Sequence, residues 1–335
     1  MSNCSIPKGY KSILSTYQTQ SAIGRLKRVF ENNLSMALNL HRVSAPLFVE
    51  PQTGLNDNLT GVERPVEFDV PQTKHAAQIV HSLAKWKRMA LFRYEFPAGV
   101  GLYTDMNAIR RDEMLDNTHS IYVDQWDWEI VITEDQRTEK FLKQTVKRIV
   151  EAIYTTSERL RWDYPELPVT VKRNVTFVTS QELEDLYPAL SPEERETQFT
   201  KEHKTVFVMK VGGKLKSGER HGHRAPDYDD WGLNGDLIFW HDVLNCAIEI
   251  SSMGIRVDKE VLDKQLTEAN CNERRELSYH KALLAGELPL TIGGGIGQSR
   301  LCMLLMGKAH VGEVQVSVWD EETLTVCESA GIKLL

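Results

Sequence analysis

The sequence has few cysteines and no spacing that pairs them. Five occur in 335 residues, with no C-x-x-C pair and no histidine at ligand spacing, so neither a disulfide framework nor a zinc site is expected. Half-buried thiols in a reducing compartment fit this pattern. They are Cys4, Cys246, Cys271, Cys302 and Cys327.

Long apolar runs are also missing. None approaches the roughly 20 residues that span a bilayer, and the N-terminus carries no apolar signal core. We therefore expect a cytoplasmic protein with no membrane partner. An excess of basic charge is absent as well, since 40 Lys and Arg stand against 47 Asp and Glu, for a net charge of −7. This balance disfavours binding to nucleic acid by bulk electrostatics.

The sequence also lacks interdomain linkers and internal repeats. With 41% hydrophobic residues and no Pro/Gly/Ser-rich linker, the sequence predicts one catalytic domain over residues 1–335, with an N-terminal helical segment, 1–40, packed on it. Polar stretches such as 65–74 are interpreted as short loops.

Helical and strand-like patterns alternate along the chain. Two helix-free stretches, 120–132 and 235–256, hold consecutive strands with short connections, which favours antiparallel pairing. We therefore predict an α+β fold with an antiparallel β-sheet flanked by helices. The expected helices are residues 12–40, 83–94, 134–161, 259–269 and 273–288. The expected strands are residues 78–81, 120–132, 206–211, 236–240, 246–251 and 314–319.

The most informative segment is TIGGGIGQSRLCMLL, which begins at Thr291. It indicates a strand, a bare glycine backbone and a helix that carries Arg300. A nucleotide could place its base on the glycines and its phosphates near the helix start and Arg300. The alternative is a tight helix start that needs glycine only for packing. No G-x-x-x-x-G-K-[ST] or G-x-G-x-x-G pattern is present, so neither a P-loop nor a dinucleotide fold is supported.

Other charged residues fit a nucleotide site. Arg110 and Arg111 lie in a polar segment, 103–118, where a loop could place a guanidinium over a phosphate. Asp236 and Glu249, on nearby strands, could hold a magnesium ion that bridges phosphates. For Glu249 alone, a solvated sheet face is the alternative.

Several blocks of sequence resemble asparagine synthetase A, an ammonia-dependent, AMP-forming ligase family with the class II aminoacyl-tRNA synthetase catalytic fold. They are DNLTG from Asp57, HSLAKWKR from His81, GLYTDMNAIRRDE from Gly101, HSIYVDQWDWE from His119, RAPDYDDW from Arg224, GLNGD from Gly232, EISSMGIRVD from Glu249 and TIGGGIGQSR from Thr291. The match runs from about Ala22 to the end. It implies a homodimer, with Arg110 in class II motif 2 and the glycine turn in motif 3.

The resemblance also implies roles for particular residues. Catalysis falls to Asp57, Arg110 and Arg300, and magnesium binding to Asp236 and Glu249. Aspartate binding falls to Ser82, Lys87, Gln125, Asp127, Arg224, Asp229, Ser252 and Arg256. ATP or AMP binding falls to Ser120, Val123, Asp236, Glu249, Ser251, Gly293, Gly294, Gly295 and Arg300.

One departure from the family concerns a loop. The family has a longer polar stretch between the DYDDW and GLNGD blocks, whereas Trp231 here directly precedes Gly232. We interpret this as a mobile loop missing from the sequence rather than a shortened loop.

The expected reaction is asparagine synthesis from L-aspartate, ammonia and ATP with Mg²⁺, through a β-aspartyl adenylate, with release of AMP and pyrophosphate. Residue 2 is Ser, and Cys4 has no partner motif, so no glutaminase nucleophile is apparent and free ammonia is the expected donor. The alternative is an aspartyl- or asparaginyl-tRNA synthetase-like paralogue with a tRNA-binding or regulatory role.

Overall fold

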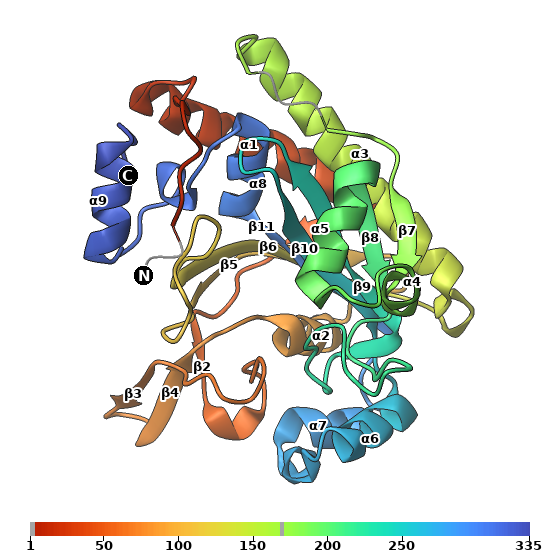
Figure 1. The fold of residues 1–335 in the computed structure, drawn as a ribbon. Coiled ribbons are helices and arrows are strands. Elements are labelled where there is room, and N and C mark those ends of the chain that lie inside the picture. The colour runs from red at the N-terminus through yellow and green to blue at the C-terminus, as the bar shows by residue number, and fades with distance from the viewer. Residues whose placement is uncertain (1–3, 168–170) are drawn as a thin grey trace.

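A computed structural model describes residues 4–167 and 171–335; residues 1–3 of the expected segment 1–40 lie outside this part. An eight-stranded sheet runs through the middle of the protein in the order β1-β5-β6-β11-β10-β9-β8-β7 (Figure 1). Its strands are β1 (Leu40–Arg42), β5 (Gly101–Ile109), β6 (Tyr122–Val131), β7 (Thr176–Thr179), β8 (Thr205–Met209), β9 (Asp229–His241), β10 (Cys246–Arg256) and β11 (Thr291–Gly297). A smaller sheet joins β2 (Phe48–Val49), β4 (His75–Ile79) and β3 (Glu67–Val70).

The large sheet is mixed. The pairings from β5 through β6, β11, β10 and β9 to β8 are antiparallel. The two outermost pairs, β1 with β5 and β7 with β8, run parallel. The prediction of an antiparallel sheet is therefore correct only for the six central strands. The parallel edges come from connections that contain helices, which sequence periodicity did not reveal in full.

One face of the sheet packs against three helices, α1 (Thr16–Leu38), α3 (Glu139–Asp163) and α8 (Gln298–Met306). The α1 helix begins at Ser15, whose side chain accepts from the Gln18 amide in a capping box. Leu26, Phe30 and Leu34 recur at helical spacing and are fully buried. Phe30 contacts Trp126 of β6, with ring centroids 4.6 Å apart. The apolar stripe seen in the sequence thus becomes the contact between α1 and the sheet.

The opposite face is covered only at its ends. One end packs against α2 (Ala84–Arg93), α6 (Lys259–Glu268) and α7 (Ser278–Leu284). The other packs against α4 (Ser180–Leu186) and α5 (Pro192–His203). Figure 1 shows the C-terminal helix α9 (Glu321–Ser329) lying to one side, near the start of the chain. Short 3-10 turns complete the fold: η1 (Pro51–Thr53), η2 (Glu134–Gln136), η3 (Asn272–Glu276) and η4 (Val311–Glu313). No helix in the described residues is long and apolar enough to cross a bilayer.

Several predicted elements need correction. Residues 273–288 form η3 and α7 rather than one helix, and α3 starts only after η2. The polar segment 103–118 begins as β5, and residues 67–70 of the predicted loop 65–74 form β3. Residues 314–319 form no strand, since Val316 and Val318 are exposed and pair with no neighbouring strand. The elements β7, α4 and α5 were not predicted.

The expectation of a missing loop after Trp231 is wrong. The chain continues from Trp231 to Gly232 within strand β9, which pairs with β10 on either side of this point, at Asp229 and from Asn234 onward. The Trp231 amide donates to Gln265 Oε1 at 2.9 Å, which anchors the strand start to α6. The connection is therefore short in this chain.

Candidate active site

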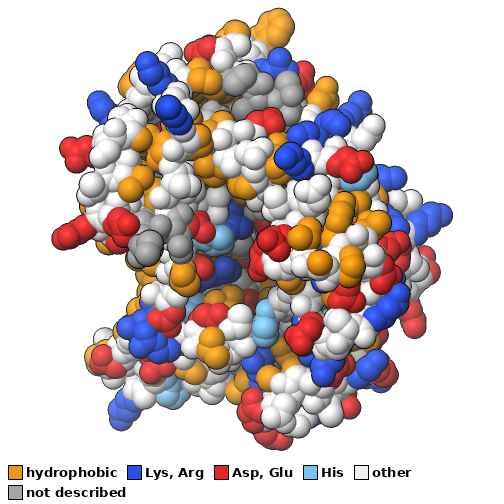
Figure 2. Space-filling model, in the orientation of Figure 1, with side chains coloured by type: hydrophobic (Ala, Val, Ile, Leu, Met, Phe, Trp, Pro, Cys, Tyr) orange, Lys and Arg blue, Asp and Glu red, His pale blue; other side chains and the backbone are white. Residues whose placement is uncertain are grey.

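A cavity of about 350 Å³ opens on the sheet face between the two groups of helices. Figure 2 shows the surface hollowed there, with acidic, basic and histidine side chains at its edges. Every residue that the sequence assigns to the site lines this cavity except Arg111, which is exposed, and Ser251 and Gly293. Those that do are Asp57, Ser82, Lys87, Arg110, Ser120, Val123, Gln125, Asp127, Arg224, Asp229, Asp236, Glu249, Ser252, Arg256, Gly294, Gly295 and Arg300.

Strand alternation explains most of this convergence. Trp126 and Trp128 of β6 point to the α1 side, so Gln125 and Asp127 point into the cavity. On β11, Ile292 and Ile296 pack with the same helices. The glycines between them leave room for the side chains of the neighbouring strands, because a Cβ on Gly295 would lie 2.3 Å from Gln125 Oε1.

A β-bulge decides which residues of β10 face the cavity. The register with β9 shifts between Glu249 and Ser251. This shift turns Glu249 and Ser252 to the same face, where Ser252 lies opposite Asp236. Ser251 is left on the other face, where it is buried, and its hydroxyl has no partner among the described residues.

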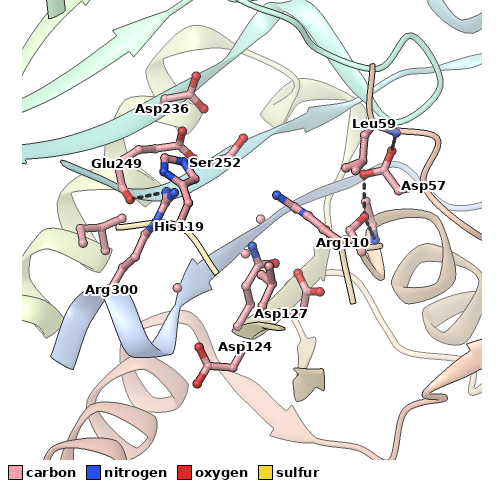
Figure 3. A pocket seen from close by; sticks show the side chains of 18 of the residues that line it. Asp57, Leu59, Arg110, His119, Asp124, Asp127, Asp236, Glu249, Ser252 and Arg300 are labelled. Carbon is pink, nitrogen blue, oxygen red and sulfur yellow. Dashed lines mark hydrogen bonds between the residues drawn. The ribbon is translucent and has the colours of Figure 1, made fainter. Parts of the chain in front are cut away.

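Two carboxylates and a hydroxyl therefore gather at one end of the cavity (Figure 3). They are hard oxygen donors of the kind that Mg²⁺ prefers, so the residues fit that ion. Enclosure by the cavity walls, and then the nearby Asp236 carboxylate, raise the pKa of Glu249, although its side chain is open to the cavity. Asp236 also accepts from Arg224 Nη2 at 2.5 Å.

The other end of the cavity holds buried ion pairs. Lys87 Nζ lies 2.6 Å from Asp127 Oδ1 and 2.9 Å from the Gly294 carbonyl oxygen. Arg256 binds Asp229 through Nη1, and its Nη2 lies 3.0 Å from Glu129 Oε2. Burial lowers the pKa of Lys87. Cations and carboxylates alternate here, which suits a ligand with charges of both signs.

Arg110 and Arg300 reach the cavity from different elements (Figure 3). Arg110 follows β5 directly, and its Nη1 lies 3.9 Å from Glu113 Oε2. Arg300 lies in the first turn of α8, after the glycine strand. Its Nε donates to the Thr118 carbonyl at 3.3 Å and its Nη1 to the Glu249 carbonyl at 3.1 Å. Two backbone carbonyls thus hold the Arg300 guanidinium at the cavity wall.

Asp57 lines the cavity from the loop after η1. Its carboxylate accepts from the Leu59 amide at 2.9 Å and from the Ser82 hydroxyl at 2.8 Å. The residue is 4% exposed. The Asp57 carboxylate thus accepts hydrogen bonds that stabilise its own loop and also borders the cavity. The same side chain can therefore form the turn and contact a ligand.

Further lining residues were not assigned from the sequence. His119 and His223 were given no role from the sequence, and both reach the cavity. Tyr228, within the block RAPDYDDW, also lines the cavity and was given no role from the sequence. The remaining unassigned residues are Leu59, Ala84, Glu113, Thr118, Tyr122, Asp124, Ile250, Gly297, Ser299, Val311 and Gln315.

Gly293 lies beneath the cavity floor, which allows a stability prediction. A Cβ there would lie 2.5 Å from Glu129 Oε2 and 2.8 Å from both Arg256 Nη2 and the Trp128 carbonyl oxygen. We expect Gly293→Ala to lower the free energy of unfolding by about 1–3 kcal/mol, because a buried ion pair and a backbone must move. Urea denaturation would measure this. Gly213→Ala, where a Cβ meets nothing within 4 Å, is the matched control and should change little.

A fully buried cluster supports the turn that carries Tyr228 and Asp229. Asp227 Oδ2 accepts from Lys85 Nζ at 3.1 Å, Arg274 Nη1 at 3.0 Å and His280 Nε2 at 3.0 Å. Burial opposes ionisation, yet the ion pair with Lys85 and the hydrogen bond from His280 lower the pKa of Asp227. Burial also lowers the pKa of His280.

The His280 shift predicts an acid-sensitive fold. A histidine whose pKa is lower when folded contributes stability that is present above its unfolded pKa and is lost as the pH falls below about 6.5. From this group we expect the free energy of unfolding to fall as the pH is lowered from 7 to 5.5, at no more than about 1.4 kcal/mol per pH unit. In the His280→Gln variant, this contribution to the fall of the free energy of unfolding with pH should be absent. Identical profiles for the two proteins would contradict the assignment.

Comparison with known proteins places the chain in a family. The family model described as aspartate-ammonia ligase matches residues 17–331. The aspartate–ammonia ligase of Clostridium tetani is 60% identical over 331 residues, which cover 98% of this chain and 97% of the relative. That of Lactobacillus acidophilus is 56% identical over 332 residues, which cover 98% and 99%.

Solved structures show the fold. The asparaginyl-tRNA synthetase of Entamoeba histolytica, in complex with asparaginyl-adenylate, matches with a TM-score of 0.63 and 13% identity, over 90% of this chain and 66% of that one. That of Pyrococcus horikoshii, complexed with the same adenylate, matches with a TM-score of 0.61 and 14% identity, over 88% and 68%. The fold is thus that of a class II aminoacyl-tRNA synthetase catalytic domain. From the family match and these identities, the chain belongs to the aspartate–ammonia ligase family.

Proposed function

We propose that this protein synthesises L-asparagine from L-aspartate, ammonia and ATP, releasing AMP and pyrophosphate. The observation that carries the proposal is one cavity with two chemically distinct ends. Arg300 and the oxygen donors Asp236 and Glu249 form an end suited to a triphosphate. Lys87 and Arg256, each paired with carboxylates, form an end suited to an amino acid.

The chemistry explains why a nucleotide is needed. A carboxylate resists attack by ammonia because its leaving group would be oxide. In the proposed first step, an oxygen of the β-carboxylate attacks the α-phosphorus of ATP and pyrophosphate leaves. In the second step, ammonia attacks the acyl carbon, AMP leaves, and a proton passes to a base. Arg110 is assigned to the α-phosphate and the reacting carboxylate, where it stabilises developing negative charge.

Asp236 and Glu249 would hold Mg²⁺, with Ser252 beside them. When bound, the ion would neutralise phosphate charge. Arg224 binds Asp236 and lies 3.7 Å from Asp229. We assign Arg224 to linking the metal end and the amino-acid end, because it contacts a carboxylate of each.

The remaining assignments concern adenine, aspartate and ammonia. The bare backbone of Gly294 and Gly295 would support the base, and the backbone of Ser120 and Val123 would bind its edge. Ser82, Gln125 and Asp127 would contact aspartate. Asp57 would attract ammonium and accept its proton.

We further propose a cytoplasmic homodimer whose 335 residues form one catalytic domain. Tyr17 and Met36, near the two ends of α1, are 86% and 83% exposed and are the residues of that helix that we assign to the contact. Sedimentation of the protein would test the dimer, and Tyr17→Glu should then shift it toward monomer.

Aspartate-dependent pyrophosphate release, measured with and without ammonium and with and without tRNA, tests the function. The synthetic reaction predicts asparagine formation that needs ammonium and ignores tRNA. The fold shared with asparaginyl-tRNA synthetases favours a second candidate, a tRNA-dependent activity. Aminoacyl-tRNA as the product, or AMP formed without asparagine in the presence of ammonium, would overturn our proposal.

A further inference from the structure

A buried cluster of two cysteines and a histidine lies where the N-terminal segment meets α9 (Figure 1). The sulfur atoms of Cys4 and Cys327 and a ring nitrogen of His310 all lie within 4.8 Å of one another. The three residues are 7%, 1% and 0% exposed. Cys4 and Cys327 stand near opposite ends of the sequence, so only the fold brings them together.

The histidine hydrogen bonds show what this cluster is suited to hold. The Gly312 backbone amide donates to His310 Nδ1 at 3.0 Å, so Nδ1 carries no proton. The neutral ring therefore carries its proton on Nε2, which is buried and unpartnered among the described nitrogen and oxygen atoms. A metal-bound histidine normally donates its other N–H to a neighbour. Here Nδ1 is occupied by a donor and Nε2 is protonated, which disfavours a metal and favours a hydrogen bond to sulfur.

The two thiols are chemically unequal. Hydrogen bonds from Cys327, and then from His310, lower the pKa of Cys4, while burial acts in the opposite direction. The same contact with Cys4 raises the pKa of Cys327. A thiol that ionises more readily beside one that holds its proton is the arrangement in which one sulfur attacks and the other resolves.

The segment that carries Cys4 is anchored close to the cavity wall. The Ser5 amide donates to Asn117 Oδ1 at 2.9 Å, and Asn117 Nδ2 donates to the Ala309 carbonyl at 2.7 Å. The Val311 amide in turn donates to the Asn117 carbonyl at 2.8 Å, and Val311 lines the cavity. A covalent bond at Cys4 would thus fix a segment that supports this wall.

We propose that Cys4 and Cys327 are a redox-active dithiol that a small-molecule disulfide oxidises to an intramolecular disulfide. The Cys4 thiolate attacks one sulfur of the small disulfide, whose S–S bond breaks and releases one small thiolate. The Cys327 thiolate then attacks the Cys4 sulfur of the mixed disulfide and releases the second. The protein dithiol is oxidised, the small disulfide is reduced to two thiols, and the two protons pass to the departing thiolates.

The test treats the full-length protein with hydroxyethyl disulfide and maps its tryptic peptides without reduction. We expect the peptide that ends at Lys8 to be joined to residues 309–333, with two thiols lost per chain. The bond closes a loop over nearly the whole chain, so the unfolding midpoint should rise by about 5 °C or more and return on reduction. Cys4→Ser and Cys327→Ser should abolish both effects, whereas Cys271→Ser, a half-buried cysteine elsewhere, should retain them.

Other outcomes would overturn the proposal. A stable mixed disulfide at Cys4 without the joined peptide would show that Cys327 does not resolve it. Joined peptides with an unchanged midpoint in the oxidised protein would show that the bond forms only after unfolding. Stoichiometric zinc in the purified protein, lost in Cys4→Ser, would identify a metal site instead.

Discussion

Replacing Arg300 with alanine is expected to lower aspartate-dependent pyrophosphate release by about 10²–10³-fold. The loss corresponds to about 3–4 kcal/mol, the usual effect of removing one well-placed donor from developing negative charge. In the structure, the Thr118 and Glu249 carbonyls hold this guanidinium, so its position does not depend on a ligand. Initial rates at saturating aspartate, with varied ATP, would measure the loss.

The control for this variant is Arg173→Ala. Arg173 is a surface arginine whose side chain is 63% exposed and pairs with Glu151. Its replacement should leave the rate unchanged. Both variants should keep the wild-type unfolding midpoint within a few degrees, because Arg300 contributes no buried ion pair in the described residues. Undiminished pyrophosphate release by Arg300→Ala would remove Arg300 from the phosphate end and weaken the assignment of ATP to this cavity.

The periodicity of apolar residues predicted those elements whose apolar residues repeat along a single helix or strand. The apolar stripe of α1 and the cap at Ser15 are visible in sequence because they repeat along one helix. The parallel pairing of β7 with β8 is not, because α4 and α5, which connect these strands, present mostly polar residues and bury only a few side chains each. The error at residues 314–319 has the same origin. Alternating valines imply a strand only if a partner strand is beside them, and Val316 and Val318 have none.

Prediction of the site succeeded where the motif and strand alternation agreed, and it was incomplete where the backbone departs from regular geometry. The bulge after Glu249 selects Ser252 over Ser251, and sequence alone left both open. Glu129 ends the block HSIYVDQWDWE but was assigned no role in the site. It pairs with Arg256, so the charge balance of the amino-acid end includes a carboxylate to which the sequence analysis gave no role. The contact of Cys4 with Cys327 is likewise a property of the fold.

The Asp57→Asn variant is expected to separate the two half-reactions. Asparagine formation should fall by about 10²–10³-fold, the typical contribution of a positioned base. Adenylate formation, followed as pyrophosphate release, should fall by less than about tenfold. An amide of the same shape fills the site but neither attracts a cation nor accepts a proton. Hydroxylamine, which is largely uncharged at neutral pH, should be affected less than ammonium as the acceptor.

The hydrogen bonds of Asp57 supply the control that makes this prediction decisive. Its carboxylate accepts from Leu59 and from Ser82, so the substitution changes both the charge and the loop. An asparagine can still accept from the Leu59 amide and can donate to the Ser82 hydroxyl, which preserves the loop. Ser82→Ala does the reverse, because it removes one loop bond and keeps the charge. If Asp57 acts on ammonium, only Asp57→Asn should release pyrophosphate out of proportion to asparagine. Equal loss of both half-reactions in both variants would assign Asp57 to aspartate binding or to the loop, and Asp229 would become the next candidate base.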